Sequence, residues 1–172
     1  MCKDCSKKPD NRKDVCLHLL ERIQSDRNFL TNVITGDESW IFEYDPETKR
    51  QSKEWHTSTS QRPKKVRRSK SKIKSTLICF FDSQETVHTE FVPHGQTVNQ
   101  FYYREILERL RKLVVRVRPS IKNNWMLHHD NAPCHMAISV IEFLAKKGIP
   151  VVPQPPYSPD LSPCDFCFCS QN

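Results

Sequence analysis

The sequence predicts an α/β domain built on a mixed five-stranded sheet that is flanked by helices. Two patterns support this prediction: three runs of strand length follow an N-terminal helical segment, and helix-like and strand-like segments then alternate to the end. The length agrees with it, because 172 residues suit a single domain and are enough to bury a sizeable core.

The first elements are expected to be a helix and a strand. Residues 11–30 place apolar side chains such as Val15 and Leu19 at helical spacing among charged residues. Residues 33–42 follow as a strand whose apolar first half ends in a polar cluster. Residues 45–74 have no regular periodicity, and a loop of this length inside a compact domain is usually functional or disordered.

A hairpin and a long helix come next. Residues 75–82 have the pattern of a buried strand, and after a short turn residues 86–92 form its expected partner. Residues 97–117 then place apolar side chains on one side and charged side chains on the other, as in a surface helix. Pro119 closes this helix.

The last elements alternate between strand and helix. Residues 125–130 are expected to form a short strand, residues 136–147 a helix, and residues 149–152 the final strand. A proline-rich run then leads to residues 164–166, where another helix should begin. A meander of three strands followed by this alternation is the order of an RNase H-like sheet, which is the fold class we predict.

Basic residues are concentrated in one segment. The chain contains 27 Lys and Arg against 20 Asp and Glu, for a net charge of +7, but residues 49–74 hold eleven of the basic residues and one acid. This segment suits nucleic acid, because neutralising phosphates releases counterions. The alternatives are a solvated loop and a nuclear-localisation run. The candidate DNA-binding residues are Lys49, Arg50, Lys53, Arg62, Lys64, Lys65, Arg67, Arg68, Lys70, Lys72 and Lys74.

The cysteine spacing raises the question of a zinc site. Two C-x-x-C pairs, Cys2 with Cys5 and Cys164 with Cys167, could be drawn as a zinc site. We expect free thiols instead, because the pairs lie at opposite ends of the chain and no paired-histidine motif accompanies them.

Membrane and secreted proteins are not expected, since no apolar run approaches the roughly 20 residues of a membrane span and no signal-peptide core is visible.

Three aspartates are candidate metal ligands. Asp37 lies in the first predicted strand, Asp130 ends the fourth, and Asp165 follows the proline-rich run. Side chains at strand ends form the ligand crevice of an α/β sheet, and carboxylates gathered there need a cation such as Mg²⁺ or Mn²⁺. Two such ions could activate a nucleophile and stabilise a leaving oxygen in phosphodiester chemistry. The structural alternatives are a turn residue, an Asx-turn and a helix N-cap, respectively.

Three motifs resemble the mariner transposases of the Tc1/mariner superfamily. They are TGDESW at Thr35–Trp40, HHDNAPCH at His128–His135 and PPYSPDLSPCDF at Pro155–Phe166. The 34 residues between Asp130 and Asp165 match the spacing of the mariner branch with three aspartates. The resemblance extends to the mariner-derived half of a histone methyltransferase fusion protein, which has Asn at the third acidic position.

The resemblance implies a catalytic domain that binds two Mg²⁺ or Mn²⁺ ions, cuts transposon ends with water and joins the 3′-OH to a TA target. Asp37 and Asp130 would ligate metal, and Asp165 would complete the second site. The basic insertion 45–74 would correspond to the clamp loop of the family, which contacts the partner subunit and DNA. Three polar residues beside the aspartates would either support the ligands or serve the fold alone: His128, His129 and Asn131.

The chain also departs from the family pattern. Full mariner transposases begin with paired helix-turn-helix domains and continue beyond the Asp-Phe pair into further helices, so we expect a truncated copy. Residues 1–30 would then be a linker or helix remnant, and residues 31–172 the catalytic domain. If intact, the protein would act as a homodimeric DNA endonuclease and strand transferase in the nucleus. The alternative is an inactive DNA-binding or dimerisation remnant.

Overall fold

The computed structural model describes residues 8–42 and 73–164 of the chain. Among these residues, no helix combines the length and the apolar character that crossing a membrane requires. The elements in chain order are α1 (Lys8–Ser25), η1 (Leu30–Asn32), β1 (Val33–Phe42), β2 (Lys74–Phe81), β3 (Thr86–Phe91), α2 (Gln100–Val117), β4 (Met126–His128), α3 (Ile138–Lys147), β5 (Val151–Val152) and η2 (Pro159–Leu161).

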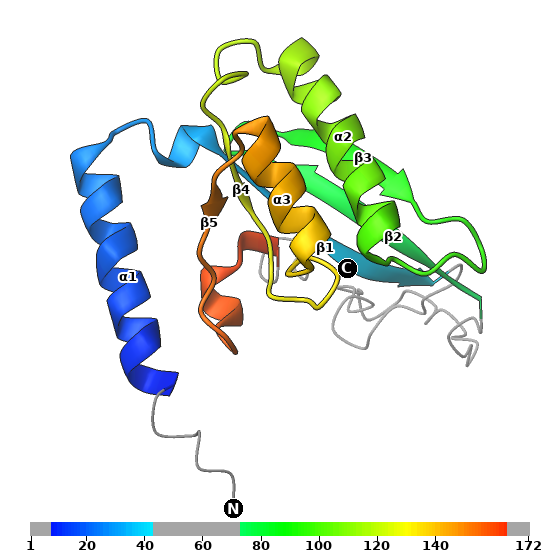
Figure 1. Ribbon diagram of the computed structural model, residues 1–172, viewed down its shortest axis with the longest axis horizontal. Coiled ribbons are helices and arrows are strands. Elements are labelled where there is room, and N and C mark those ends of the chain that lie inside the picture. Colours follow the sequence, from blue (N-terminus) through cyan, green and yellow to red (C-terminus); the bar gives the residue numbers. More distant parts are fainter. Residues whose placement is uncertain (1–7, 43–72, 165–172) are drawn as a thin grey trace, which may run out of the picture.

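The five strands form one mixed sheet in the order β3-β2-β1-β4-β5 (Figure 1). The first three strands pair as an antiparallel meander, while β4 lies parallel to β1 and β5 lies parallel to β4. Parallel neighbours require crossover connections, and α2 and α3 supply them. The predicted mixed five-stranded sheet flanked by helices is therefore confirmed.

Helices α2 and α3 cover one face of this sheet (Figure 1). The main core lies between these helices and the sheet, where Ile34 and Leu127 from the two central strands meet Ile106 and Leu110 of α2 and Val140 of α3. All five side chains are completely buried. Burying an aliphatic side chain of this size contributes roughly 1.5–3 kcal/mol, so this layer stabilises the docking of both helices on the sheet.

A smaller cluster lies on the other face of the same two strands. Successive side chains of a strand point to opposite faces, so Val33 and Met126 face away from the main core. They pack with Phe29, Val152 and, from α1, Leu19. Helix α1 thus docks against the sheet through this cluster, beside β4 and β5 (Figure 1).

The ends of two helices are fixed by particular residues. The side chain of Asn99 accepts hydrogen bonds from the backbone amides of Phe101 and Tyr102, so α2 begins at Gln100 rather than at residue 97. Gly148 ends α3 in the left-handed conformation with φ 67°, a conformation that favours glycine.

Some predicted boundaries were wrong. The helix expected over 11–30 ends at Ser25, because the side chain of Asp26 accepts the amide of Asn28 and turns the chain. The last two strands are also shorter than predicted: β4 has three residues and β5 has two. Most of the basic insertion 45–74 lies outside the described residues.

Candidate active site

Asp37 lies in β1, and Asp130 comes two residues after the end of the adjacent parallel strand, β4. The register pairs Thr35 of β1 with His128 of β4, and each aspartate comes two residues later in its own segment. The carboxyl ends of parallel strands meet at one edge of a sheet, which is where ligands bind in α/β folds. Asp37 is not a turn residue, because it lies inside β1 and pairs with Cys79 of β2.

The side chain of Tyr103 is buried and lies within electrostatic range of both aspartates. Burial raises the pKa of Tyr103 well above its usual value, and the negative charges of Glu38, Asp130 and Asp37 raise it further. These charges come from β1 and from the segment that follows β4, whereas the tyrosine belongs to α2. The site is therefore built where the sheet meets the helix layer.

Asp130 is held by two hydrogen bonds to a single oxygen. Its Oδ1 atom accepts the amide of Ala132 at 3.0 Å and the Nδ1–H of His135 at 2.7 Å. The first bond is the Asx-turn that the sequence offered as a structural alternative. Half of the side chain remains exposed, and the bond from His135 lowers the pKa of Asp130 below its usual value. The Asx-turn and a metal-binding role are therefore compatible, because the turn leaves half of the Asp130 side chain exposed to solvent.

His135 is the site residue that sequence reasoning missed. Its side chain is 1% exposed and joins Asp130 to Glu38, with Nε2 lying 3.1 Å from Oε1 of Glu38. Burial lowers the pKa of His135, but the bonds to Asp130 and Glu38 outweigh burial and raise it to about 10. His135 is therefore an imidazolium that holds two carboxylates. The signal was its place at the end of the HHDNAPCH motif.

Three aromatic rings stack beneath the carboxylates. The ring of His135 lies 4.1 Å from the centroid of Tyr103 and 4.9 Å from that of His129. Burial, followed by the charge of His135, lowers the pKa of His129 to about 3, so His129 is neutral. The hydroxyl of Tyr103 is hydrogen-bonded to Nδ1 of His129 at 3.0 Å. Each of the three rings contacts the other two, so the packing restricts the orientation of both histidines.

His128 belongs to a separate chain of hydrogen bonds. Its Nδ1 lies 3.0 Å from the hydroxyl of Thr35, and its Nε2 lies 3.0 Å from Oε1 of Gln154. The amide of Gln154 donates onward to the carbonyl of Ser158. Burial lowers the pKa of His128, which is consistent with a neutral ring that donates from Nε2. This chain connects β1 and β4 to the proline-rich loop.

Two further contacts complete the surroundings of this loop. The side-chain amide of Asn131 donates to the carbonyl of Gln154 at 2.7 Å, so Asn131 and His128 both hold the loop. The thiol of Cys164 lies 3.6 Å from the hydroxyl of Thr35 and is buried. Thr35 and Asp37 point to the same face of β1. The contact with Thr35 therefore holds Cys164, the residue before Asp165, on the same face as Asp37.

The described residues contain only part of the predicted metal and DNA sites. Asp165 lies outside them, as do all the candidate DNA-binding residues except Lys74, whose ammonium group lies 3.8 Å from the ring centroid of Trp40. Within residues 8–42 and 73–164, no group of three or more His, Cys, Asp or Glu side chains is placed to hold a metal ion. Cys2, Cys5 and Cys167 also lie outside, so the zinc alternative stays untested.

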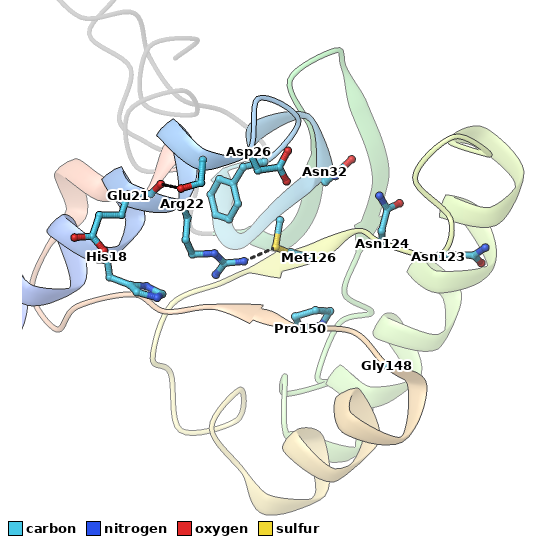
Figure 2. A pocket seen from close by; sticks show the side chains of 12 residues that line it. His18, Glu21, Arg22, Asp26, Asn32, Asn123, Asn124, Met126, Gly148 and Pro150 are labelled. Atoms are coloured by element: carbon cyan, nitrogen blue, oxygen red, sulfur yellow. Dashed lines mark hydrogen bonds between the residues drawn. The ribbon is translucent and has the colours of Figure 1, made fainter.

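Two clefts border these elements. Asp130 lines a cleft of about 460 Å³ together with Asn131, Gln154 and the proline-rich loop. The other cleft, of about 530 Å³, lies between α1 and the sheet, where Arg22 reaches the sulfur of Met126 at 3.2 Å (Figure 2). None of the candidate metal ligands lines this second cleft. Of the two clefts, only the first adjoins the candidate site.

Comparisons with known proteins identify relatives of the chain. A family model described as a transposase (partial DDE domain) matches residues 45–123. The Mariner Mos1 transposase of Drosophila mauritiana is 32% identical over 161 residues, which cover 91% of this chain and 45% of the relative. The human histone-lysine N-methyltransferase SETMAR is 30% identical over 143 residues, covering 80% of this chain and 20% of that protein. The chain thus spans less than half of either relative.

Solved structures agree with the sequence comparison. The catalytic domain of Mos1 mariner transposase superposes with a TM-score of 0.75 at 29% identity, covering 99% of this chain and 72% of that one. The Mos1 mariner paired end complex with Mn gives a TM-score of 0.81 at 31% identity, over 99% and 49% of the two chains. These matches confirm the RNase H-like fold class. By sequence and by fold, the chain is similar to the mariner transposases and has a Mos1-like catalytic domain.

Proposed function

We propose that this chain performs metal-dependent cleavage and strand transfer of DNA, as the catalytic domain of a mariner-type transposase. The observation that supports this most directly is the register of β1 and β4, which pairs Thr35 with His128 and so places Asp37 and Asp130 two residues beyond the same pair. The same residues belong to motifs that resemble the family. Strand cleavage and strand transfer need carboxylates gathered at one edge of a sheet, and this arrangement brings two of them together.

Asp37 and Asp130 are the proposed metal ligands. Their oxygens suit Mg²⁺ or Mn²⁺, and solved structures of Mos1 are described with Mn and with Mg. When bound, two such ions would lower the pKa of a water nucleophile and neutralise charge on the leaving oxygen. The residues themselves would hold the ions: Asp130 is oriented by Ala132 and His135, and its carboxylate is half exposed toward solvent.

We propose Asp165 as the third ligand. Its neighbour Cys164 is buried against Thr35, on the face of β1 to which Asp37 also points. The chain of bonds from Thr35 through His128 to Gln154 would keep the proline-rich loop in place beside this anchor. On this proposal His128 and Asn131 act by holding the loop, and His129 acts by packing against His135.

The proposed substrate is transposon-end DNA, joined to a TA target, with a second copy of the chain as partner. Mos1 structures are described as a paired end complex and a strand transfer complex. The basic residues between Lys49 and Lys74 would contact the DNA phosphates and the partner subunit, as a clamp. A protein that cuts chromosomal DNA would work in the nucleus.

A plasmid-nicking experiment tests the proposed function. The chain should convert supercoiled plasmid to open circles in Mn²⁺ or Mg²⁺, and chelation by EDTA should stop it. Asp37→Asn and Asp130→Asn should each lower the nicking rate by at least about 100-fold, because each removes a charged ligand while keeping the side-chain shape.

The matched control is Asp160→Asn, which changes an exposed aspartate in η2 that forms an ion pair with the exposed Arg12. This variant should nick at the wild-type rate. Equal nicking by the wild type and by both ligand variants would show contamination and reject the proposal. DNA binding without nicking by the wild type would favour the inactive remnant.

A further inference from the structure

His135 occupies a fixed position between two carboxylates. Its side chain is 1% exposed, and its two ring nitrogens lie 2.7 Å from Asp130 and 3.1 Å from Glu38. The rings of Tyr103 and His129 pack against it, so it has little freedom to rotate. Since both nitrogens face carboxylate oxygens, both donate a proton, and His135 makes two charge-assisted hydrogen bonds.

Glu38 reaches His135 from the helix-covered side of the sheet. Ile34 and Glu38 lie four residues apart on β1, so both point to the face that α2 and α3 cover, whereas Asp37 points to the other face. A carboxylate on the covered face needs a counter-ion, because an unpaired buried charge is costly. His135 is that counter-ion, and Glu38 in turn fixes the position of its ring.

Asp130 receives its orientation from the same histidine. Two donors, the amide of Ala132 and Nδ1 of His135, both bind the Oδ1 atom of Asp130. Two donors on one oxygen fix the plane of the carboxylate and so aim the second oxygen, Oδ2. A ligand that is aimed before the metal arrives binds it more tightly, because less side-chain freedom is lost on binding.

We propose that His135 is a positioning residue: braced by Glu38, it aims Oδ2 of Asp130 at the metal site. This inference rests on the proposed function, since it assumes that Asp130 binds a divalent cation. It assigns Glu38 a role distinct from that of its neighbour Asp37, as a brace that does not touch the metal. It also separates two effects of His135, which are to support the fold and to orient the ligand.

Two substitutions at position 135 distinguish these effects. In His135→Asn the side-chain amide takes the place of Nδ1 and can still donate to Asp130. In His135→Gln the amide takes the place of Nε2 and can donate only to Glu38. Both variants lose the imidazolium charge and one of the two bonds. A merely structural role would make them equally defective, whereas the positioning role makes them differ.

The measurement is Mn²⁺ binding by the full 172-residue chain, followed through the electron paramagnetic resonance signal of free Mn²⁺. We expect His135→Gln to weaken Mn²⁺ binding by about 10–100-fold and His135→Asn to recover most of this loss. Plasmid nicking should follow the same order. Thermal unfolding in EDTA checks that each variant is folded. The control is His88→Gln, which alters a histidine that contacts a carboxylate, Glu90, away from the site.

A second pair of variants serves if substitutions at position 135 prevent folding. Glu38→Gln and Glu38→Leu remove the same charge, but only the glutamine keeps an oxygen that accepts from Nε2 of His135. The brace therefore predicts tighter Mn²⁺ binding by Glu38→Gln than by Glu38→Leu. Wild-type Mn²⁺ affinity in His135→Gln, or equal affinities within each folded pair, would overturn the inference alone. Absence of Mn²⁺ binding by the wild type would overturn the proposed function as well.

Discussion

Arg118 and Asp82 form a buried ion pair that joins the end of α2 to the turn between β2 and β3. Their side chains are 9% and 2% exposed, and Nε of Arg118 lies 2.6 Å from Oδ2 of Asp82. The other carboxylate oxygen accepts the amides of Gln84 and Glu85. Burial raises the pKa of Asp82, but the bond from Arg118 and these amides outweigh burial and hold the pKa below its usual value.

Asp82→Asn should therefore destabilise the fold. The substitution keeps the shape of the side chain but leaves the guanidinium of Arg118 buried without its charged partner. Removing one member of a buried pair costs about 3–5 kcal/mol, measured as the free energy of unfolding in urea at pH 7. The matched control is Glu85→Gln, because Glu85 is 72% exposed and lies 3.4 Å from the same arginine. Its loss should cost at most about 1 kcal/mol.

The difference between the wild type and Asp82→Asn should depend on pH. Because the folded-state pKa of Asp82 is depressed, its contribution is complete above the unfolded-state pKa and disappears as the pH falls through the folded-state value. Unfolding measured from pH 6 down to pH 3 should show the two stabilities approaching each other below about pH 4. Two curves that stay parallel over this range would contradict the assignment.

At the scale of elements, Gly36, the residue before Asp37 in β1, leaves room for the ring of Phe80 in β2. Gly36 pairs with Phe80 of β2, whose ring covers the glycine on the helix-covered side of the sheet. A Cβ atom at this position would come within 2.1 Å of the ring of Phe80, which is 1% exposed and cannot move freely. The glycine of the TGDESW motif therefore has a packing reason in this fold.

Gly36→Ala should force Phe80 to shift. Overpacking of this kind costs about 1–3 kcal/mol, which a urea titration would measure as a lower free energy of unfolding. The same substitution in a Phe80→Val background should cost less, because valine lacks the ring atoms that the new Cβ meets. Costs that add without any coupling would show that the ring is not the obstacle.

The sequence pattern predicted these elements to different degrees, for physical reasons. Helix α2 begins at Gln100 rather than at residue 97, but its end at Val117 was predicted, since helical periodicity is a local feature. The length of β5 was not, because its two residues are defined only by pairing with Leu127 and His128 of β4. Strand length at a sheet edge depends on the partner strand, and periodicity within one segment contains no information about it.

The candidate site, too, was predictable from local sequence patterns only in part. Asp37 in the first strand and Asp130 near the end of the fourth could be placed from local patterns, and the register agrees with a shared crevice, although β4 ends at His128. The bridge from His135 to Glu38 joins residues 97 positions apart in the chain. It depends on the Asx-turn at Asp130 and on the packing of α2 against the sheet. Tertiary contacts of this kind leave no spacing pattern in the sequence.

At the scale of the whole molecule, charge is divided between a body and a segment. Residues 49–74 hold eleven basic residues and one acid, so the rest of the chain has a slight excess of acids. Several basic residues of the described body are paired with acids, such as Arg109 with Glu90 and Arg111 with Glu108. A body of this kind offers little attraction to DNA phosphates, so binding should depend on the basic segment.

The salt dependence of DNA binding tests this division. Each phosphate contact in B-DNA adds about 0.9 to the slope of log K against log salt concentration. Replacing five residues of the segment by Ala should weaken binding and lower the slope by up to about 4.5 if all five contact phosphates: Arg62, Lys64, Lys65, Arg67 and Arg68. Binding of a duplex without specific sites, measured by fluorescence anisotropy from 50 to roughly 200 mM salt, gives both quantities.

The control for this experiment is a second variant that loses the same number of positive charges from another part of the chain. Five exposed basic residues of the described body are replaced instead: Arg27, Lys112, Arg116, Lys122 and Lys146. If DNA attraction depends on local contacts in the segment, this variant should keep most of the wild-type slope, although both variants have lost five positive charges. Equal losses in the two variants would mean that DNA responds to the net charge of the molecule, and the segment would then have no special role in binding.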